Sequence, residues 1–316
     1  MKRILICASA AIVALASCSE THVVYNEAPT EIGFKVLDAA MTKATALHET
    51  HETMGVFANY TNDHAEYFPN VQFEYHDDAT PAHWGGTVTQ YYPMTGNLNF
   101  ACYAPYDQNA WSLEYSDDGK ATLKGTGLTS LDKTDLLYGK TLSVDNEKSS
   151  DLVDVTLSHA LAEIVINVKA NEANLITFNS ITVKSVSADG TFTAVYDAAS
   201  GTLESAEWVA GTPKDHQMTS TAYLTTESSE YGRFFIVPGS QTRLTIDYTI
   251  KDYLKNKTVD IGLDDTNAAE WERGKRYIYN LSASVYAIRL NPSVEDMEEV
   301  KQISSQDGSE IWTEIN

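Results

Sequence analysis

Cysteine is scarce in this chain, with only Cys7, Cys18 and Cys102 among 316 residues. We expect Cys7 to be removed and Cys18 to be modified, for the reasons given below. Only Cys102 would then remain, which excludes a disulfide within one mature chain. A chain of this length without disulfides has to rely on its own apolar cores, and its length favours two domains over one.

Positive charge is also scarce. The chain has 22 Lys and Arg against 44 Asp and Glu, a formal net charge of −22 at pH 7. Nucleic-acid affinity comes largely from Lys and Arg that neutralise phosphates, so the composition excludes a nucleic-acid partner. Attachment to anionic lipid by charge is excluded for the same reason.

The apolar run at the N-terminus is too short to span a membrane, which takes about 20 apolar residues. It extends from Ile4 to Ala16, follows the basic pair Lys2-Arg3 and ends in Leu15-Ala16-Ser17-Cys18. A basic start, a short apolar run and small residues are typical of an export signal, and the cysteine makes it a bacterial lipobox. We predict that residues 1–17 are a lipoprotein signal peptide and that Cys18 carries the lipid anchor, labelled by palmitate.

Catalytic motifs are missing from the sequence as well: it has no Gly-x-Ser-x-Gly elbow, phosphate loop or EF-hand spacing. His48 and His51 are three residues apart, whereas a zinc-protease helix needs them four apart. We interpret His76-Asp77-Asp78 and His83 as polar turn residues, and His159 as a structural histidine. The sequence therefore predicts no catalytic residue, no metal site and no cofactor, although folding alone can still pair two carboxylates for glycoside hydrolysis.

Alternation of apolar and polar residues dominates the rest of the chain, with turn residues such as Asp117-Asp118-Gly119 between the runs. It predicts an all-β fold. The alternating apolar sets are Ile32, Phe34 and Val36; Val71, Phe73 and Tyr75; Leu98, Phe100, Cys102 and Ala104; Leu244, Ile246, Tyr248 and Ile250; and Tyr277, Tyr279, Leu281 and Ala283. Between Asp151 and Lys169 the apolar parity switches, which predicts a bulge or kink near Ser158-His159-Ala160. A helical stripe also fits this segment, but its Val and Ile content favours strand.

Composition suggests where the domains divide. Residues 140–151 are polar and small and form the best candidate linker. We predict a signal peptide at 1–17, an N-terminal β-sandwich at 18–150, a C-terminal β-sandwich at 151–287 and an acidic C-terminal appendage at 288–316.

Six short motifs follow one another in a fixed order behind the lipobox. They are Leu98-Asn99-Phe100-Ala101-Cys102-Tyr103-Ala104-Pro105-Tyr106, Asp135-Leu136-Leu137-Tyr138, Val155-Thr156-Leu157-Ser158-His159-Ala160-Leu161-Ala162, Phe235-Ile236-Val237-Pro238-Gly239, Trp271-Glu272-Arg273-Gly274-Lys275-Arg276-Tyr277-Ile278-Tyr279 and Ile288-Arg289-Leu290-Asn291-Pro292. In this order the sequence resembles the fimbrillin family, the lipoprotein subunits of type V pili. The resemblance implies two tandem transthyretin-like β-sandwich domains, export as a lipoprotein and a place on the outer membrane at the cell surface.

The resemblance also implies a route of assembly. In polymerising members a protease cuts the loop after the first strand, and a strand from a neighbouring subunit fills the groove that opens. Here the corresponding loop predicts Lys43-Ala44 as the processing site, where many members have Arg. Ile32, Phe34 and Val36 would form the self-complementing first strand, and the candidate donor residues are Ile288, Leu290, Ile311 and Trp312.

The resulting hypothesis is a non-catalytic structural lipoprotein of the cell surface, either a pilus subunit or an anchored accessory. Its partners would be other pilus subunits or copies of itself, the outer membrane through the lipid, and a host or bacterial surface ligand. The alternative is a carbohydrate-binding surface lipoprotein that stacks sugars on exposed tryptophans. The candidates for such platforms are Trp84, Trp111, Trp208 and Trp271.

Overall fold

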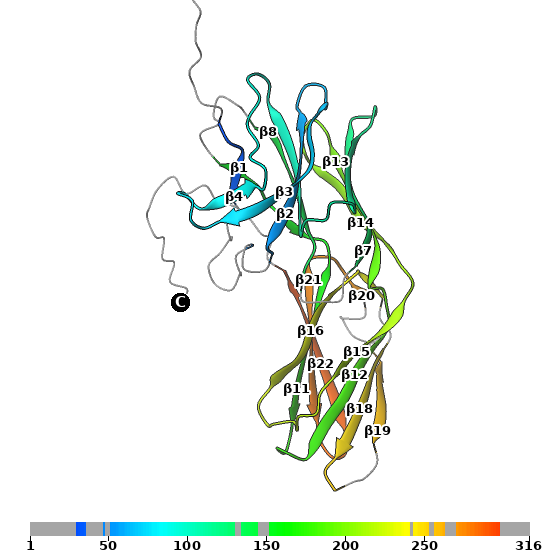
Figure 1. Cartoon of the computed structure of the whole chain (residues 1–316). Helices are drawn as coiled ribbons and strands as arrows, with labels where there is room; N and C mark the ends of the chain where they lie inside the picture. The colour runs from blue at the N-terminus through cyan, green and yellow to red at the C-terminus, as the bar shows by residue number, and fades with distance from the viewer. Residues whose placement is uncertain are drawn as a thin grey trace, which may run out of the picture.

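The computed structural model describes residues 30–35, 47, 51–129, 134–144, 152–240, 243–252, 256–262 and 270–297. These residues form 22 β-strands arranged in two lobes, one above the other in Figure 1. The predicted all-β fold class is confirmed. Within the described ranges, no helix has the length and apolar character needed to cross a membrane.

The N-terminal lobe is built on an eight-stranded sheet with the order β10-β8-β5-β2-β3-β4-β1-β9. Its strands are β1 (Gly33–Lys35), β2 (Thr53–Tyr60), β3 (Glu66–His76), β4 (His83–Gly86), β5 (Leu98–Ala104), β8 (Leu137–Val144), β9 (Val153–Asp154) and β10 (Ser158–His159). Figure 1 shows the cyan β3–β4 hairpin turned across β2 rather than continuing in the same plane. The apolar residues of β1, β3 and β4 therefore pack on the same face of β2 and β5.

A second sheet, with the order β14-β13-β7-β6, covers the opposite face of β2, β5 and β8. Its strands are β6 (Trp111–Tyr115), β7 (Lys120–Thr129), β13 (Asp189–Asp197) and β14 (Leu203–Ala210). Half of this sheet comes from beyond residue 150, since β13 pairs with β7 from Asp189↔Thr129 to Asp197↔Lys120. The predicted domain ranges stay a prediction, but residues 189–210 lie in the N-terminal lobe.

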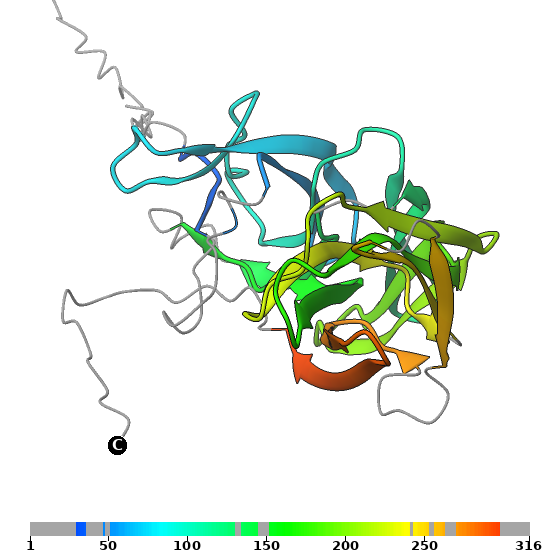
Figure 2. The same ribbon diagram turned by 90° about the horizontal axis from the view of Figure 1, so that it is seen from below.

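The C-terminal lobe is a sandwich of two four-stranded sheets, β16-β11-β21-β22 and β15-β12-β18-β19, around one apolar core. Figure 2 shows the strands of this lobe from below. The strands are β11 (Ala162–Ala170), β12 (Ile176–Val186), β15 (Lys214–Thr219), β16 (Ser229–Ile236), β18 (Arg243–Ile250), β19 (Lys257–Gly262), β21 (Lys275–Ala283) and β22 (Ile288–Asp296), with the short pair β17 (Gly239–Ser240) and β20 (Glu270–Trp271) beside them.

The switch of apolar parity predicted after residue 151 marks the passage between the lobes. Val153 in β9 pairs with β1, and Ser158-His159 in β10 pairs with β8, both within the N-terminal sheet. β11 then begins at Ala162 in the C-terminal sheet. The strand interpretation and the predicted kink near residues 158–160 are confirmed, because the two parities face two different cores.

Candidate assembly site

The first strand, β1, lies between two strands and is hydrogen-bonded to both. Phe34 is the register partner of Trp84 in antiparallel β4 and of Val153 in parallel β9. The residues just before β1 are hydrogen-bonded to residues 90–92. Ile32 N donates to Gln90 O at 2.8 Å, and Tyr92 N donates to Thr30 O at 2.9 Å. The strand thus completes the sheet instead of leaving an open edge there.

Apolar side chains surround this strand. Ile32 and Phe34 are both 0% exposed. The Phe34 ring meets Phe73 and Phe100 edge to face, with ring centroids 5.1 Å apart in each pair. Burying two side chains of this size contributes roughly 3–6 kcal/mol from removal of apolar surface alone. An empty groove of this kind would be costly until another apolar strand filled it.

The other predicted assembly residues fall in two places. Ile288 and Leu290 are half-buried in β22, which pairs with β21 along nine residue pairs from Lys275↔Asp296 to Ala283↔Ile288. Residues 288–296 therefore differ from the predicted appendage: their alternation places apolar side chains on the C-terminal core. Cys18, Val36, Lys43, Ala44, Ile311 and Trp312 lie outside the described residues.

Several of the sequence motifs meet where the two lobes join. Ala160 N donates to Leu136 O at 2.7 Å, and Gly274 N donates to Leu161 O at 2.8 Å. Arg273 Nη1 donates to the Tyr138 hydroxyl at 2.6 Å. These contacts join three of the motifs, which shows that much of the sequence pattern is structural.

A buried polar cluster lies at the same junction. Asp135 accepts hydrogen bonds from the His159 ring through its carboxylate and from His51 Nε2, at 2.9 Å, through its backbone carbonyl. Burial lowers the pKa of His51, while the contacts with Asp135 act in the opposite direction. Since both histidines donate to Asp135, the cluster fastens residues 134–136 to β10 and to the start of β2. His159 is the structural histidine that the sequence predicted.

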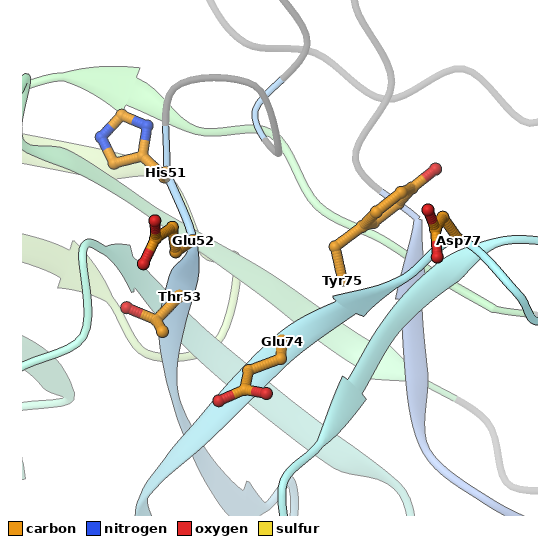
Figure 3. A pocket seen from close by; sticks show the side chains of 6 residues that line it. All are labelled: His51, Glu52, Thr53, Glu74, Tyr75 and Asp77. Atoms are coloured by element: carbon orange, nitrogen blue, oxygen red, sulfur yellow. The ribbon is translucent and has the colours of Figure 1, made fainter.

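A shallow depression of about 470 Å³ lies beside this cluster, between the ends of β2 and β3. Its lining residues are His51, Glu52, Thr53, Glu74, Tyr75 and Asp77. Figure 3 shows the three carboxylates spread around the rim rather than converging on one point. The spread does not resemble the paired carboxylates of a glycosidase, which lie across a scissile bond from each other.

The tryptophans proposed as sugar platforms are mostly inside the protein. Trp84, Trp111 and Trp271 are buried in the three apolar cores. Trp208 is half-buried, and its ring centroid lies 5.3 Å from that of Phe192. Its Nε1 donates a hydrogen bond to Ala160 O at 2.6 Å. Stacking on a sugar needs an exposed ring face, so these side chains do not support the carbohydrate-binding alternative.

The fold and this site define a class: a structural β-sandwich protein in two lobes that holds its own first strand in an apolar groove. A family model described as fimbrillin-like matches residues 41–296. The chain belongs to the fimbrillin-like family. Membership in this family indicates a structural, non-enzymatic role in pili or in adhesion at the cell surface.

Solved structures of proteins from Bacteroides species share the fold. A proposed cell adhesion protein from Bacteroides uniformis matches with a TM-score of 0.56 at 15% identity, covering 85% of this chain and 98% of its own. A second, from Bacteroides ovatus, matches with a TM-score of 0.50 at 16% identity, covering 88% and 99%. At this identity the similarity shows the fold alone. None of the curated proteins compared with this chain matches it.

Proposed function

We propose that this protein is a lipid-anchored fimbrillin of the outer membrane, a pilus subunit or an anchored accessory, that assembles by donor-strand exchange. The observation that carries the proposal is the complete burial of Phe34 in β1, a strand of only three residues, and of Ile32 just before it. A strand of three residues forms few backbone hydrogen bonds of its own, while the Phe34 ring packs against Phe73 and Phe100. Such a strand is suited to replacement by another of the same chemistry.

The donor in this proposal comes from residues 298–316 of another copy, with Ile311 and Trp312 as its apolar residues. Ile288 and Leu290 are less suited to donation than the sequence suggested, because they already pack on their own core in β22. The partners are copies of this chain or other pilus subunits. Adhesion to a host or bacterial surface ligand would be a property of the assembled structure.

Cleavage of the chain after β1, within residues 42–46, should turn the monomer into polymers. We would replace residues 42–46 with the recognition sequence of a site-specific protease, cut the purified protein and follow its mass by light scattering. The intact protein should stay monomeric because its groove is filled. After cleavage, release of β1 should leave a groove that the C-terminal segment of another copy fills.

The matched control is the same protein without residues 298–316, which keeps β22 complete. It should be cut equally well but remain monomeric. Polymers from this shortened chain would show that the donor lies elsewhere. A cleaved full-length protein that loses its first strand yet stays a folded monomer would refute strand exchange for this chain.

The proposed lipid anchor has its own test. Labelled palmitate should be incorporated into the wild-type protein in cells and not into the Cys18→Ala variant, because acyl transfer needs the thiol. Cys18→Ala should also move the protein from the membrane fraction to the soluble fraction or leave it unprocessed. Equal labelling of both proteins would contradict the assignment of Cys18.

A further inference from the structure

Two histidines face each other at the end of the β3–β4 hairpin. His76 and His83 are cross-strand register partners, and their ring centroids are 6.0 Å apart with an angle of 47° between the rings. Both side chains are half-exposed, so solvent reaches them. A cross-strand pair of imidazoles on neighbouring strands is a compact arrangement of two nitrogen ligands.

The rings lie over a bare patch of backbone made by Gly33 in β1 and Gly85 in β4, which are register partners. His76 Nε2 lies 3.1 Å from the point where a Cβ on Gly85 would stand. His83 Nε2 lies 3.5 Å from the corresponding point on Gly33. The absence of two side chains leaves room for the rings close to the backbone of the sheet.

A carboxylate from the first strand segment reaches the same patch. Glu31 Oε1 lies 3.6 Å from the Cβ point of Gly85, the point that His76 Nε2 also approaches. Glu31 is exposed, so its side chain is free to change rotamer. Asp77 and Asp78 follow His76 in the turn and are exposed, which adds negative charge beside the pair.

The hydrogen bonding of His83 fixes which nitrogen is available. Its Nδ1 lies 2.9 Å from Pro81 O, and because a carbonyl only accepts, Nδ1 carries the hydrogen. Nε2 of the neutral ring then carries the lone pair. A backbone carbonyl that orients the ring in this way is the usual outer partner of a metal-binding histidine.

We propose that His76, His83 and Glu31 form a binding site for a divalent transition metal of the zinc type. Two imidazole nitrogens and one carboxylate oxygen match the ligands that Zn²⁺ accepts, with water completing the coordination. No group of three such side chains already surrounds one point in the described part of the chain. Binding therefore requires Glu31 and the two rings to close together by side-chain rotation.

The metal would connect β1 to the hairpin beside it, because Glu31 precedes β1 and both histidines belong to β3 and β4. It would hold the first strand in its groove and oppose its release. This consequence rests on the proposed strand exchange, whereas metal binding itself does not.

Titration calorimetry of the purified protein with ZnCl₂ tests the site. We expect one Zn²⁺ per chain, and an affinity at least about tenfold lower in His76→Gln and in His83→Gln. Glu31→Gln should weaken binding less than either histidine variant. His216→Gln is the matched control, since His216 is also half-buried but lies in β15 of the other lobe, and it should bind zinc as the wild type does. Circular dichroism of every variant checks that it is folded.

The results of these experiments test the metal site and the proposed strand exchange separately. Absence of zinc binding to the wild type, or unchanged binding in the double variant His76→Gln/His83→Gln, would overturn the site. Zinc should also slow the loss of the first strand from the cleaved protein described above, and Glu31→Gln should remove this effect. Zinc that binds without slowing strand loss would overturn the link to assembly. Failure of the cleaved protein to polymerise without zinc would instead count against the proposed function.

Discussion

Phe34→Ala should lower the free energy of unfolding by about 3–5 kcal/mol, the usual result of truncating a buried phenylalanine. Phe34 is completely buried, and its ring is the contact that joins Phe73 on β3 to Phe100 on β5. On one side of β1, β4 is held by its pairing with β3, which limits how far it can move to close the cavity. Urea unfolding of the uncleaved protein, followed by tryptophan fluorescence, measures the loss.

The neighbouring Lys35→Ala is the control for this prediction, because Lys35 lies on the same short strand with its side chain half-exposed. It should change stability by less than about 0.5 kcal/mol, as surface substitutions usually do. If Phe34→Ala cost as little as Lys35→Ala, the first strand would not be part of the cooperative core. The self-complementing role proposed for it would then lose its physical basis.

The double variant Arg233→Ala/Arg276→Ala should be destabilised by about 3 kcal/mol. Both arginines bond to Glu163, which is 2% exposed at the centre of the sheet, Arg233 from β16 on one side and Arg276 from β21 on the other. Removing them leaves a buried carboxylate without its cations, a change that costs about 3–5 kcal/mol. Solvent reaches both guanidinium groups, which places the expected loss at the lower end.

Changing Glu163 as well should restore much of this stability. The triple variant with Glu163→Gln carries no buried charge and should regain at least about half of the loss. Chemical denaturation of the three proteins at pH 7 measures the difference. A triple variant as unstable as the double variant would show that the arginines act by packing their side chains rather than by neutralising Glu163.

Strands with one buried face could be predicted from the sequence, because their alternation is visible in one dimension. Leu244, Ile246 and Ile250 are all buried in β18, as their common parity predicted. In β5, more residues are buried than the alternation predicted. Asn99 and Tyr103, on the face opposite to Phe100, are buried too, because a second sheet covers that side. Polar and aromatic residues on a covered face look the same in sequence as residues facing solvent.

Long-range pairing was not predictable in the same way. β13 and β14 alternate like any other hairpin, and nothing local indicates that they join β7 in the first lobe. The burial of Ile32 and Phe34 follows from their alternation, but their position between β4 and β9 depends on contacts far along the chain. His76 and His83 were interpreted from the sequence as turn residues, whereas the structure makes them cross-strand partners in the β3–β4 hairpin, because the register of a pair of strands cannot be read from the turn alone.

The pairing of β7 with β13 also sets the order in which the protein can mature. A ribosome delivers the chain from its N-terminus, so β7 emerges well before residues 189–197, a delay on the order of ten seconds at usual rates of synthesis. During that interval one edge of β7 has no partner, and an unpaired edge is the part of a sheet that aggregates. The first lobe can therefore be completed only after β11 and β12 of the second lobe have been made, and its pairing of β7 with β13 is a long-range contact of the kind that slows folding.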